Sequence, residues 1–136
     1  MVSDMSGLED LFAAALAARQ RAYAPYSRFP VGAALRAESG AVYAGCNVEN
    51  AAYPLGVCAE TAAISAMIAA GERRIAEILV VGPGPGRIAP CGACRQRIAE
   101  FGAGALVHLA DEQGAIETFA LADLLPRAFG PESLKT

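Results

Sequence analysis

The sequence IAEILVV at residues 75–81 is followed by GPGPG at residues 82–86 and PCGAC at residues 90–94. The first run is apolar and bounded by turn residues, as expected of a strand buried on both faces of a sheet. The Gly/Pro run must be a loop, and the cysteines then stand where a helix begins that continues to Phe101. This strand–loop–helix unit predicts helices packed against a sheet.

The other elements alternate along the chain in the same way. Helical spacing of apolar residues predicts a first helix ending near Tyr23, before Pro25, and a second running from Cys58 to Ala70. The remaining predicted strands and a short helix cover residues 31–37, 41–46, 105–110, 115–119 and 121–125. The predicted fold class is therefore α/β, a three-layer α/β/α sandwich with a mixed five-stranded sheet, in a single domain spanning residues 1–136.

Composition excludes several classes of protein. With 54% hydrophobic and 18% charged residues, the chain is expected to fold around a core. A net charge of −3 gives no basic excess, so no nucleic-acid partner is expected. The first ten residues lack the basic region of a secretory signal, and no segment approaches the roughly 18 apolar residues needed to cross a bilayer. We therefore expect a cytoplasmic protein without a membrane partner, whose four cysteines serve a metal or reactive thiols.

The spacing of three cysteines predicts a zinc site. Cys91 and Cys94 lie three positions apart in the first turn of a predicted helix, so both sulfurs can reach one ion. Cys58 begins another helix, and helix N-termini stabilise thiolates. Cys46 and His108 are the candidates for a fourth ligand. Cys46 is expected to be a small buried side chain and His108 a structural histidine, which leaves the fourth position open to water.

Glu60 follows Cys58 too closely in the first helical turn to be an easy co-ligand. A carboxylate beside a metal-activated water can take a proton and return it to a leaving nitrogen. Taken alone, Glu60 could equally be an acidic residue favoured by the helix N-terminus. Together with the three thiols it is predicted to be the catalytic acid/base.

The combined pattern, CAE at residues 58–60 and PCGAC at residues 90–94, resembles the signature of zinc nucleobase deaminases. Nearly the whole chain is similar to the small, homotetrameric cytidine deaminases, as seen at residues 23–34, 45–56, 90–96 and 124–129. The resemblance implies a cytidine deaminase-like fold that holds Zn²⁺. It also implies a homotetramer with its sites at subunit junctions.

The resemblance assigns further residues to the substrate. Asn47 and Glu49 would hydrogen-bond the ribose 3′-hydroxyl, Phe29 would pack against the pyrimidine, and Ala59 would contact the nucleoside. Phe129 would reach into a neighbouring subunit's site and stack on the base. The implied reaction of pyrimidine salvage is hydrolytic deamination of free cytidine and deoxycytidine to uridine and deoxyuridine, with release of ammonia. Turn formation, solvation or core packing would explain several of these residues equally well.

One position departs from the family pattern. Relatives with three cysteine ligands often carry an arginine directly after the CAE triplet, where it offsets the thiolate charge, and this chain has Thr61. Three thiolates around Zn²⁺ leave a formal charge of about −1, which weakens the metal as a Lewis acid. Thr61 can donate to a sulfur but brings no charge. Arg95 resembles the arginine that normally follows the second cysteine pair, and whether it compensates is left open.

Two other functions also stay open. A deaminase of a related cytosine nucleoside, such as a blasticidin-type antibiotic, is favoured by the unusual Thr61. A non-catalytic, zinc-stabilised binding domain is disfavoured by Glu60, because a structural zinc site does not need an acid/base beside the metal.

Overall fold

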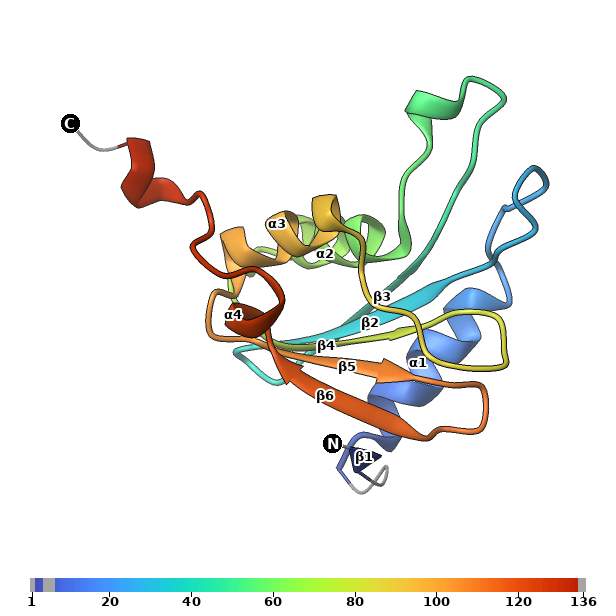
Figure 1. Ribbon diagram of the computed structural model, residues 1–136, viewed down its shortest axis with the longest axis horizontal. Helices are drawn as coiled ribbons and strands as arrows, with labels where there is room; N and C mark the ends of the chain where they lie inside the picture. The colour runs from blue at the N-terminus through green and yellow to red at the C-terminus, as the bar shows by residue number, and fades with distance from the viewer. Residues whose placement is uncertain (1, 4–6, 135–136) are drawn as a thin grey trace.

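The computed structural model describes residues 2–3 and 7–134, and within them one mixed six-stranded sheet forms the middle layer (Figure 1). Its order is β1-β6-β5-β4-β2-β3, in which β4 and β5 are parallel and the other neighbours antiparallel. The strands are β1 (Val2–Ser3), β2 (Gly32–Ala37), β3 (Val42–Cys46), β4 (Ile75–Val81), β5 (Leu106–Ala110) and β6 (Ile116–Ala120).

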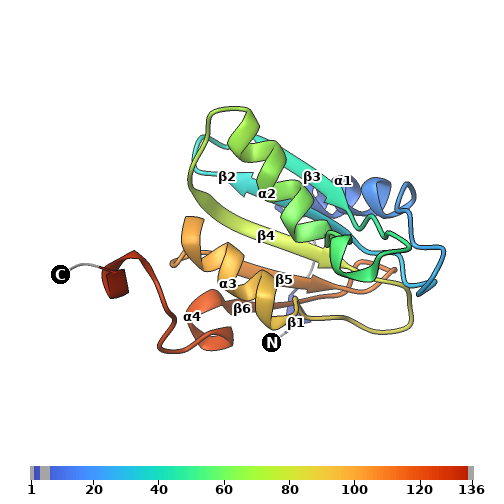
Figure 2. The same cartoon turned by 90° about the horizontal axis from the view of Figure 1, so that it is seen from above.

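The helices lie on both faces of the sheet, which confirms the predicted three-layer α/β/α sandwich (Figure 2). Helix α1 covers one face, and α2 and α3 lie side by side on the other. The helical segments are α1 (Glu9–Arg19), η1 (Tyr53–Leu55), α2 (Ala59–Ala69), α3 (Gly92–Phe101), α4 (Leu121–Leu124) and η2 (Pro131–Leu134). No helix in the described part of the chain is long and apolar enough to span a membrane.

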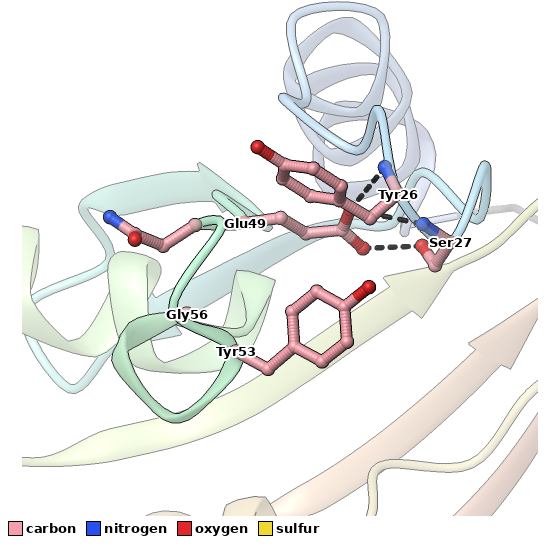
Figure 3. Close-up of a pocket in the computed structure, with 6 residues that line it drawn as sticks. Tyr26, Ser27, Glu49, Tyr53 and Gly56 are labelled. Atoms are coloured by element: carbon pink, nitrogen blue, oxygen red, sulfur yellow. Dashed lines mark hydrogen bonds between the residues drawn. The ribbon is translucent and has the colours of Figure 1, made fainter.

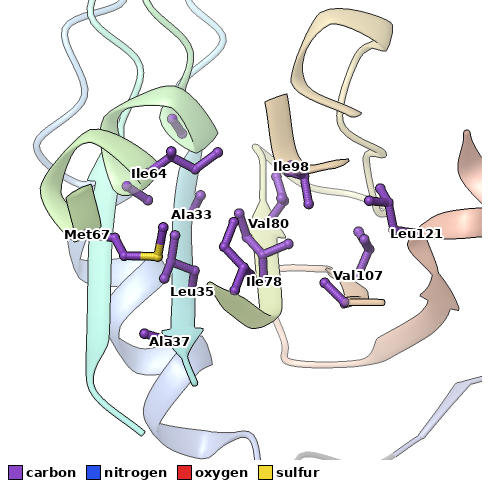
Figure 4. Close-up of a cluster of buried hydrophobic side chains, with 14 of the residues drawn as sticks. Ala33, Leu35, Ala37, Ile64, Met67, Ile78, Val80, Ile98, Val107 and Leu121 are labelled. Carbon is purple, nitrogen blue, oxygen red and sulfur yellow. The ribbon is translucent and has the colours of Figure 1, made fainter. Parts of the chain in front are cut away.

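Strand β4 has the two-sided burial that its apolar sequence predicts. Ile78 and Val80 pack into the cluster beneath α2 and α3, which Figure 4 shows. Leu79 and Val81 point the other way, into the cluster beneath α1. Because successive side chains of a strand face opposite sides, a central strand between two helical layers needs apolar residues at almost every position.

Two local predictions were wrong. Helix α1 ends at Arg19 rather than near Tyr23, because Tyr23 is extended and bridges to Val48. Its backbone N–H donates to the Asn47 carbonyl at 3.0 Å, and its carbonyl accepts from the Glu49 N–H at 2.8 Å. The five predicted strands are all present, but β1 adds a sixth at the edge beside β6. A two-residue strand is too short to show any alternation in the sequence.

Candidate metal and active site

Two helix N-termini on the same face of the sheet carry the first two thiols of the predicted site. Cys58 is the N-cap residue of α2 and Cys91 that of α3, and both have extended backbones. Their carbonyls accept the first helical hydrogen bonds, from Ala62 at 3.1 Å and from Arg95 at 2.9 Å. The partial positive charge at each helix start favours a thiolate there.

Cys58, Glu60 and Cys94 form a tight cluster of ligand-type side chains between these helices. Their ligand atoms all lie within 4.8 Å of one another, and the two sulfurs are 2.6 Å apart. Cys94 is fully buried, and Glu60 is only 4% exposed. The hydrogen bond between the thiols lowers the pKa of Cys58 and raises that of Cys94, because it favours one thiolate accepting from one thiol. Burial raises the pKa of Glu60.

Cys91 stands slightly apart from this cluster. It is exposed, and its sulfur is not a member of the close group formed by Cys58, Glu60 and Cys94. It lines the same cavity as Cys58 and Glu60, three positions before Cys94 on α3. A third thiol therefore lines the cavity that Cys58 and Glu60 also line.

The donor set fits zinc. Two sulfurs meet at a nearly buried point, with the Glu60 carboxyl beside them, and a third sulfur lines the adjoining cavity. Thiolates select zinc over harder cations such as Mg²⁺. Among the residues that the structure describes, this is the one group of three or more such side chains placed to hold a metal.

Cys46 and His108 lie outside the cluster. Cys46 ends β3 and is half-buried. His108 is buried on β5 between Thr118 and Glu77, each 2.8 Å from one of its ring nitrogens. Its neighbours in the strand, Val107 and Leu109, face α2 and α3, so His108 faces the α1 side, away from the thiols.

A cavity of about 210 Å³ opens beside the cluster. It brings together most of the residues predicted to bind the substrate; its lining comprises Phe29, Val31, Asn47, Cys58, Ala59, Glu60, Ile88, Ala89 and Cys91. The cavity is small and lined mostly by apolar side chains, and its ionisable groups are Cys58, Glu60 and Cys91. Such a cavity suits one small ring compound.

Asn47 ties the Phe29 segment into the cavity wall. Its side-chain oxygen accepts from the Val31 N–H at 2.9 Å, and its amide nitrogen donates to the Phe29 carbonyl at 3.0 Å. Phe29 itself remains 43% exposed. Since an amide nitrogen carries two hydrogens, one donor of Asn47 stays available beside the cavity.

Glu49 lies in a neighbouring pocket of about 270 Å³ rather than in the cavity of Asn47 (Figure 3). Its carboxylate accepts from the backbone N–H groups of Tyr26 at 3.0 Å and Ser27 at 3.1 Å, and from the Ser27 hydroxyl. The Ser27 hydroxyl is the main cause that lowers the pKa of Glu49. Tyr53 stands across this pocket, with its ring 5.8 Å from that of Tyr26.

Phe129 is outside both pockets of its own chain. It is 59% exposed on the segment after α4, which runs away from the sheet (Figure 1). Its carbonyl accepts from the Gln96 side chain at 2.7 Å, so α3 anchors the segment.

The side chains around the thiols differ from the sequence-based expectation at one position. The Thr61 hydroxyl lies 3.1 Å from the Cys58 sulfur. Arg95 turns to the backbone instead and donates to the carbonyls of Pro90 at 2.8 Å and Leu124 at 3.0 Å. Arg97 is the guanidinium that reaches the sulfurs, at 3.6 Å from Cys58 and 3.8 Å from Cys94.

Arg97 was not among the residues predicted from the sequence, although its spacing carries a signal. A residue three positions after Cys94 lies on the same side of α3 as that thiol. The contact with Cys94 raises the pKa of Arg97 further above its ordinary value. A search for a basic residue one turn beyond each predicted ligand would have found it.

Comparisons with known proteins agree with this geometry. Residues 5–110 match the model of the cytidine and deoxycytidylate deaminase zinc-binding region. A cytidine deaminase of Sporosarcina psychrophila is 48% identical over 128 residues, covering 93% of this chain and 94% of that protein. One of Halalkalibacterium halodurans is 45% identical over 121 residues, covering 88% and 92%.

Solved structures give the same result. The cytidine deaminase of Burkholderia pseudomallei has a TM-score of 0.85 and 51% identity, covering 90% of this chain and 98% of that one. The enzyme of Mycobacterium tuberculosis has a TM-score of 0.77 and 40% identity, covering 89% and 95%. By fold, by ligand-type residues and by sequence, this chain belongs to the cytidine and deoxycytidylate deaminase family.

Proposed function

We propose that this chain is a zinc-dependent cytidine deaminase, a hydrolase that converts free cytidine and deoxycytidine to uridine and deoxyuridine and releases ammonia. One observation carries the proposal: the buried Glu60 carboxyl stands beside two thiols at the end of a small cavity. A structural zinc site does not need an acid/base group at that place, whereas a hydrolytic site does.

Cys58, Cys91 and Cys94 would hold the metal, and Glu60 would carry protons. Zinc bound there would supply a Lewis acid that lowers the pKa of a water molecule. Glu60 would take one proton from the attacking water and deliver it to the ring nitrogen N3. It would then take the proton of the hydroxyl now on C4 and deliver it to the amino group, which leaves as ammonia. Burial favours the protonated form of Glu60, which suits a group that must both accept and return a proton.

The cavity walls would bind the nucleoside. Phe29 and Ala59 line the cavity, where Phe29 would pack against the pyrimidine and the small Ala59 would leave room beside the metal ligands. The second amide hydrogen of Asn47, which neither Val31 nor Phe29 uses, would donate to a sugar hydroxyl. Glu49, held by Ser27 in the adjoining pocket, would contact the same sugar. Buried hydrogen bonds of this kind disfavour a free base, which would leave them unpaired.

We also propose that the chain works as a homotetramer whose sites lie at subunit junctions. Several large apolar side chains are more than half exposed and so available for contacts between subunits: Tyr23, Tyr53, Leu55, Phe129 and Leu134. Phe129 lies outside its own cavity and is free to complete a neighbour's. The membership of the family and the exposed surface support this assembly.

Replacing Glu60 with Gln tests the proposed function. We expect zinc to remain bound and deamination of cytidine, followed by ultraviolet absorbance, to fall at least about 100-fold, because Gln cannot exchange protons. Glu100→Gln, an exposed carboxylate on α3, is the matched control and should keep full activity. Undiminished turnover by Glu60→Gln would refute the mechanism, and an inactive zinc-loaded wild type would refute the function.

A panel of cytosine nucleosides separates this substrate from its nearest alternative. Cytidine and deoxycytidine should be the preferred substrates. A preference for a blasticidin-type nucleoside over both would reassign the substrate while keeping the chemistry.

A further inference from the structure

The predicted zinc site gathers several acidic groups, and the residue beside Cys58, Thr61, is uncharged. Metal binding requires the cysteines as thiolates, so Cys58, Cys91 and Cys94 would bring three negative charges to one ion. Glu60, within 4.8 Å of Cys58 and Cys94, adds a fourth acidic group. Thr61 can donate a hydrogen bond to Cys58 but carries no charge.

Two arginines of α3, Arg95 and Arg97, follow Cys94 within one turn, and the structure distinguishes their contacts. Arg95 is committed to the backbone carbonyls of Pro90 and Leu124. Arg97 directs one guanidinium nitrogen to both sulfurs, 3.6 Å from Cys58 and 3.8 Å from Cys94. A single nitrogen shared between the ligands of two helices links the start of α2 to the first turns of α3.

We propose that Arg97 is a positioning residue of the metal centre, which offsets the charge of the thiolates and fixes the Cys58 and Cys94 sulfurs for zinc. This inference rests on the zinc site of the proposed function, but it does not depend on the substrate or on the proton path. Arg97 touches ligands rather than substrate, and therefore its first effect is on zinc affinity.

The expected effect is moderate because Arg97 is exposed to solvent. Residues that orient metal ligands from outside typically change metal affinity about 10–100-fold when replaced. Salt and water screen an exposed charge, so we expect the lower end of this range, about tenfold. The effect should also shrink as salt concentration rises, which would not happen if Arg97 acted only by packing.

The experiment measures the zinc dissociation constant of the full-length protein by competition with a chelating dye at low and high salt. The variants are Arg97→Gln, Arg97→Lys and the double change Thr61→Arg with Arg97→Gln. Arg74→Gln, an exposed arginine before β4, is the matched control. Thermal unfolding of the zinc-free forms verifies that each variant folds.

We expect Arg97→Gln to weaken zinc binding about tenfold at low salt and less at high salt. Arg97→Lys should retain most of the affinity, because it keeps the charge. Thr61→Arg should restore much of the loss, because residue 61 already places its side chain 3.1 Å from the Cys58 sulfur. Arg74→Gln should bind zinc like the wild type.

Two outcomes would overturn the inference while leaving the proposed function intact. One is a zinc affinity of Arg97→Gln equal to that of a wild type that binds zinc and deaminates cytidine. The other is an equal, salt-independent loss in Arg97→Gln and Arg97→Lys that Thr61→Arg does not restore, which would make the role structural. A wild type that binds no zinc would overturn both the inference and the proposed function.

Discussion

Glu77 is the central residue of a polar row on the face of the sheet that α1 covers. Its carboxylate accepts from the Arg36 side chain at 2.9 Å and lies 2.8 Å from a ring nitrogen of His108. The other ring nitrogen of His108 lies 2.8 Å from the Thr118 hydroxyl, and Arg36 forms a salt bridge with Asp10 at 2.8 Å. The row joins α1 to β2, β4, β5 and β6, so it crosses most of the sheet.

Replacing Glu77 with Gln should remove part of the pH dependence of stability. Burial alone would raise the pKa of Glu77, but hydrogen bonds from Arg36 and His108 outweigh it and lower that pKa from its ordinary value of 4.5. A pKa that is lower in the folded state means that ionised Glu77 stabilises the fold above about pH 4.5. This stabilisation is lost as the pH falls through the folded-state pKa.

Urea unfolding from about pH 7 down to about pH 3 measures this effect. Glu77→Gln should be less stable than the wild type by about 1–2 kcal/mol near neutral pH, with the difference shrinking in acid. Glu100→Gln should show no such trend. A difference that stays constant with pH would mean that the charge of Glu77 does not contribute.

Among single residues, those that belong to a short motif could be predicted from the sequence. Cys58, Glu60 and Cys94 were selected from CAE and PCGAC, and the structure brings these three together. Arg97 was missed because an arginine on a helix is usually a solvated residue. Its position over two sulfurs depends on how α2 packs beside α3, which no local pattern records.

At the scale of elements, two glycines set how closely the helices approach the sheet. A Cβ added to Gly45 of β3 would lie 2.5 Å from the backbone nitrogen of Ala63 in α2. One added to Gly32 of β2 would lie 1.9 Å from the Ala15 carbonyl oxygen in α1. At both points the helix backbone touches the strand, so a side chain would have to push the layers apart.

Gly45→Ala should therefore disturb both the fold and the metal site. Overpacking of this kind costs about 1–3 kcal/mol, and displacing α2 would also move Glu60 and Cys58 relative to Cys94. Gly104→Ala is the control, since its Cβ would have nothing within 4 Å. For Gly45→Ala, the free energy of unfolding measured with urea and the affinity for zinc should both fall. Wild-type values of both would show that α2 does not pack so closely against β3.

The course of the chain was predictable where turn residues bound apolar runs. Gly40 and Gly114 both have positive φ, at 98° and 89°, and they turn the chain between β2 and β3 and between β5 and β6. The end of α1 was not predictable, because the bridge between Tyr23 and Val48 depends on contacts distant in sequence. Tertiary contacts override local preference at such boundaries.

For the molecule as a whole, the sheet buries both faces beneath its own helices, yet large apolar side chains remain outside. Tyr53 and Leu55 are 74% and 68% exposed on the loop after β3, and Phe129 is 59% exposed beyond α4. These segments lie at the rim of the sandwich rather than over its core (Figure 1). Exposed apolar groups on these two separate segments are available for contacts with further subunits.

The proposed homotetramer can be tested by the mass of the protein in solution and by the role of Phe129. We expect the purified protein to sediment at about four times its chain mass of 14.0 kDa. Phe129→Ala should lower kcat/KM for cytidine while keeping zinc, because in the proposed assembly the ring would stack on the base in a neighbouring site. Leu134→Ala, another exposed apolar residue of the same segment, is the control and should stay active.

Subunit mixing tests whether Phe129 acts across the junction. Glu60→Gln subunits are inactive but carry an intact Phe129, whereas Phe129→Ala subunits keep Glu60. If Phe129 serves a neighbour, refolding the two variants together should give more activity than the sum of the separate variants, because some Phe129→Ala sites then receive an intact ring. Activity equal to that sum would place the effect of Phe129 within its own chain.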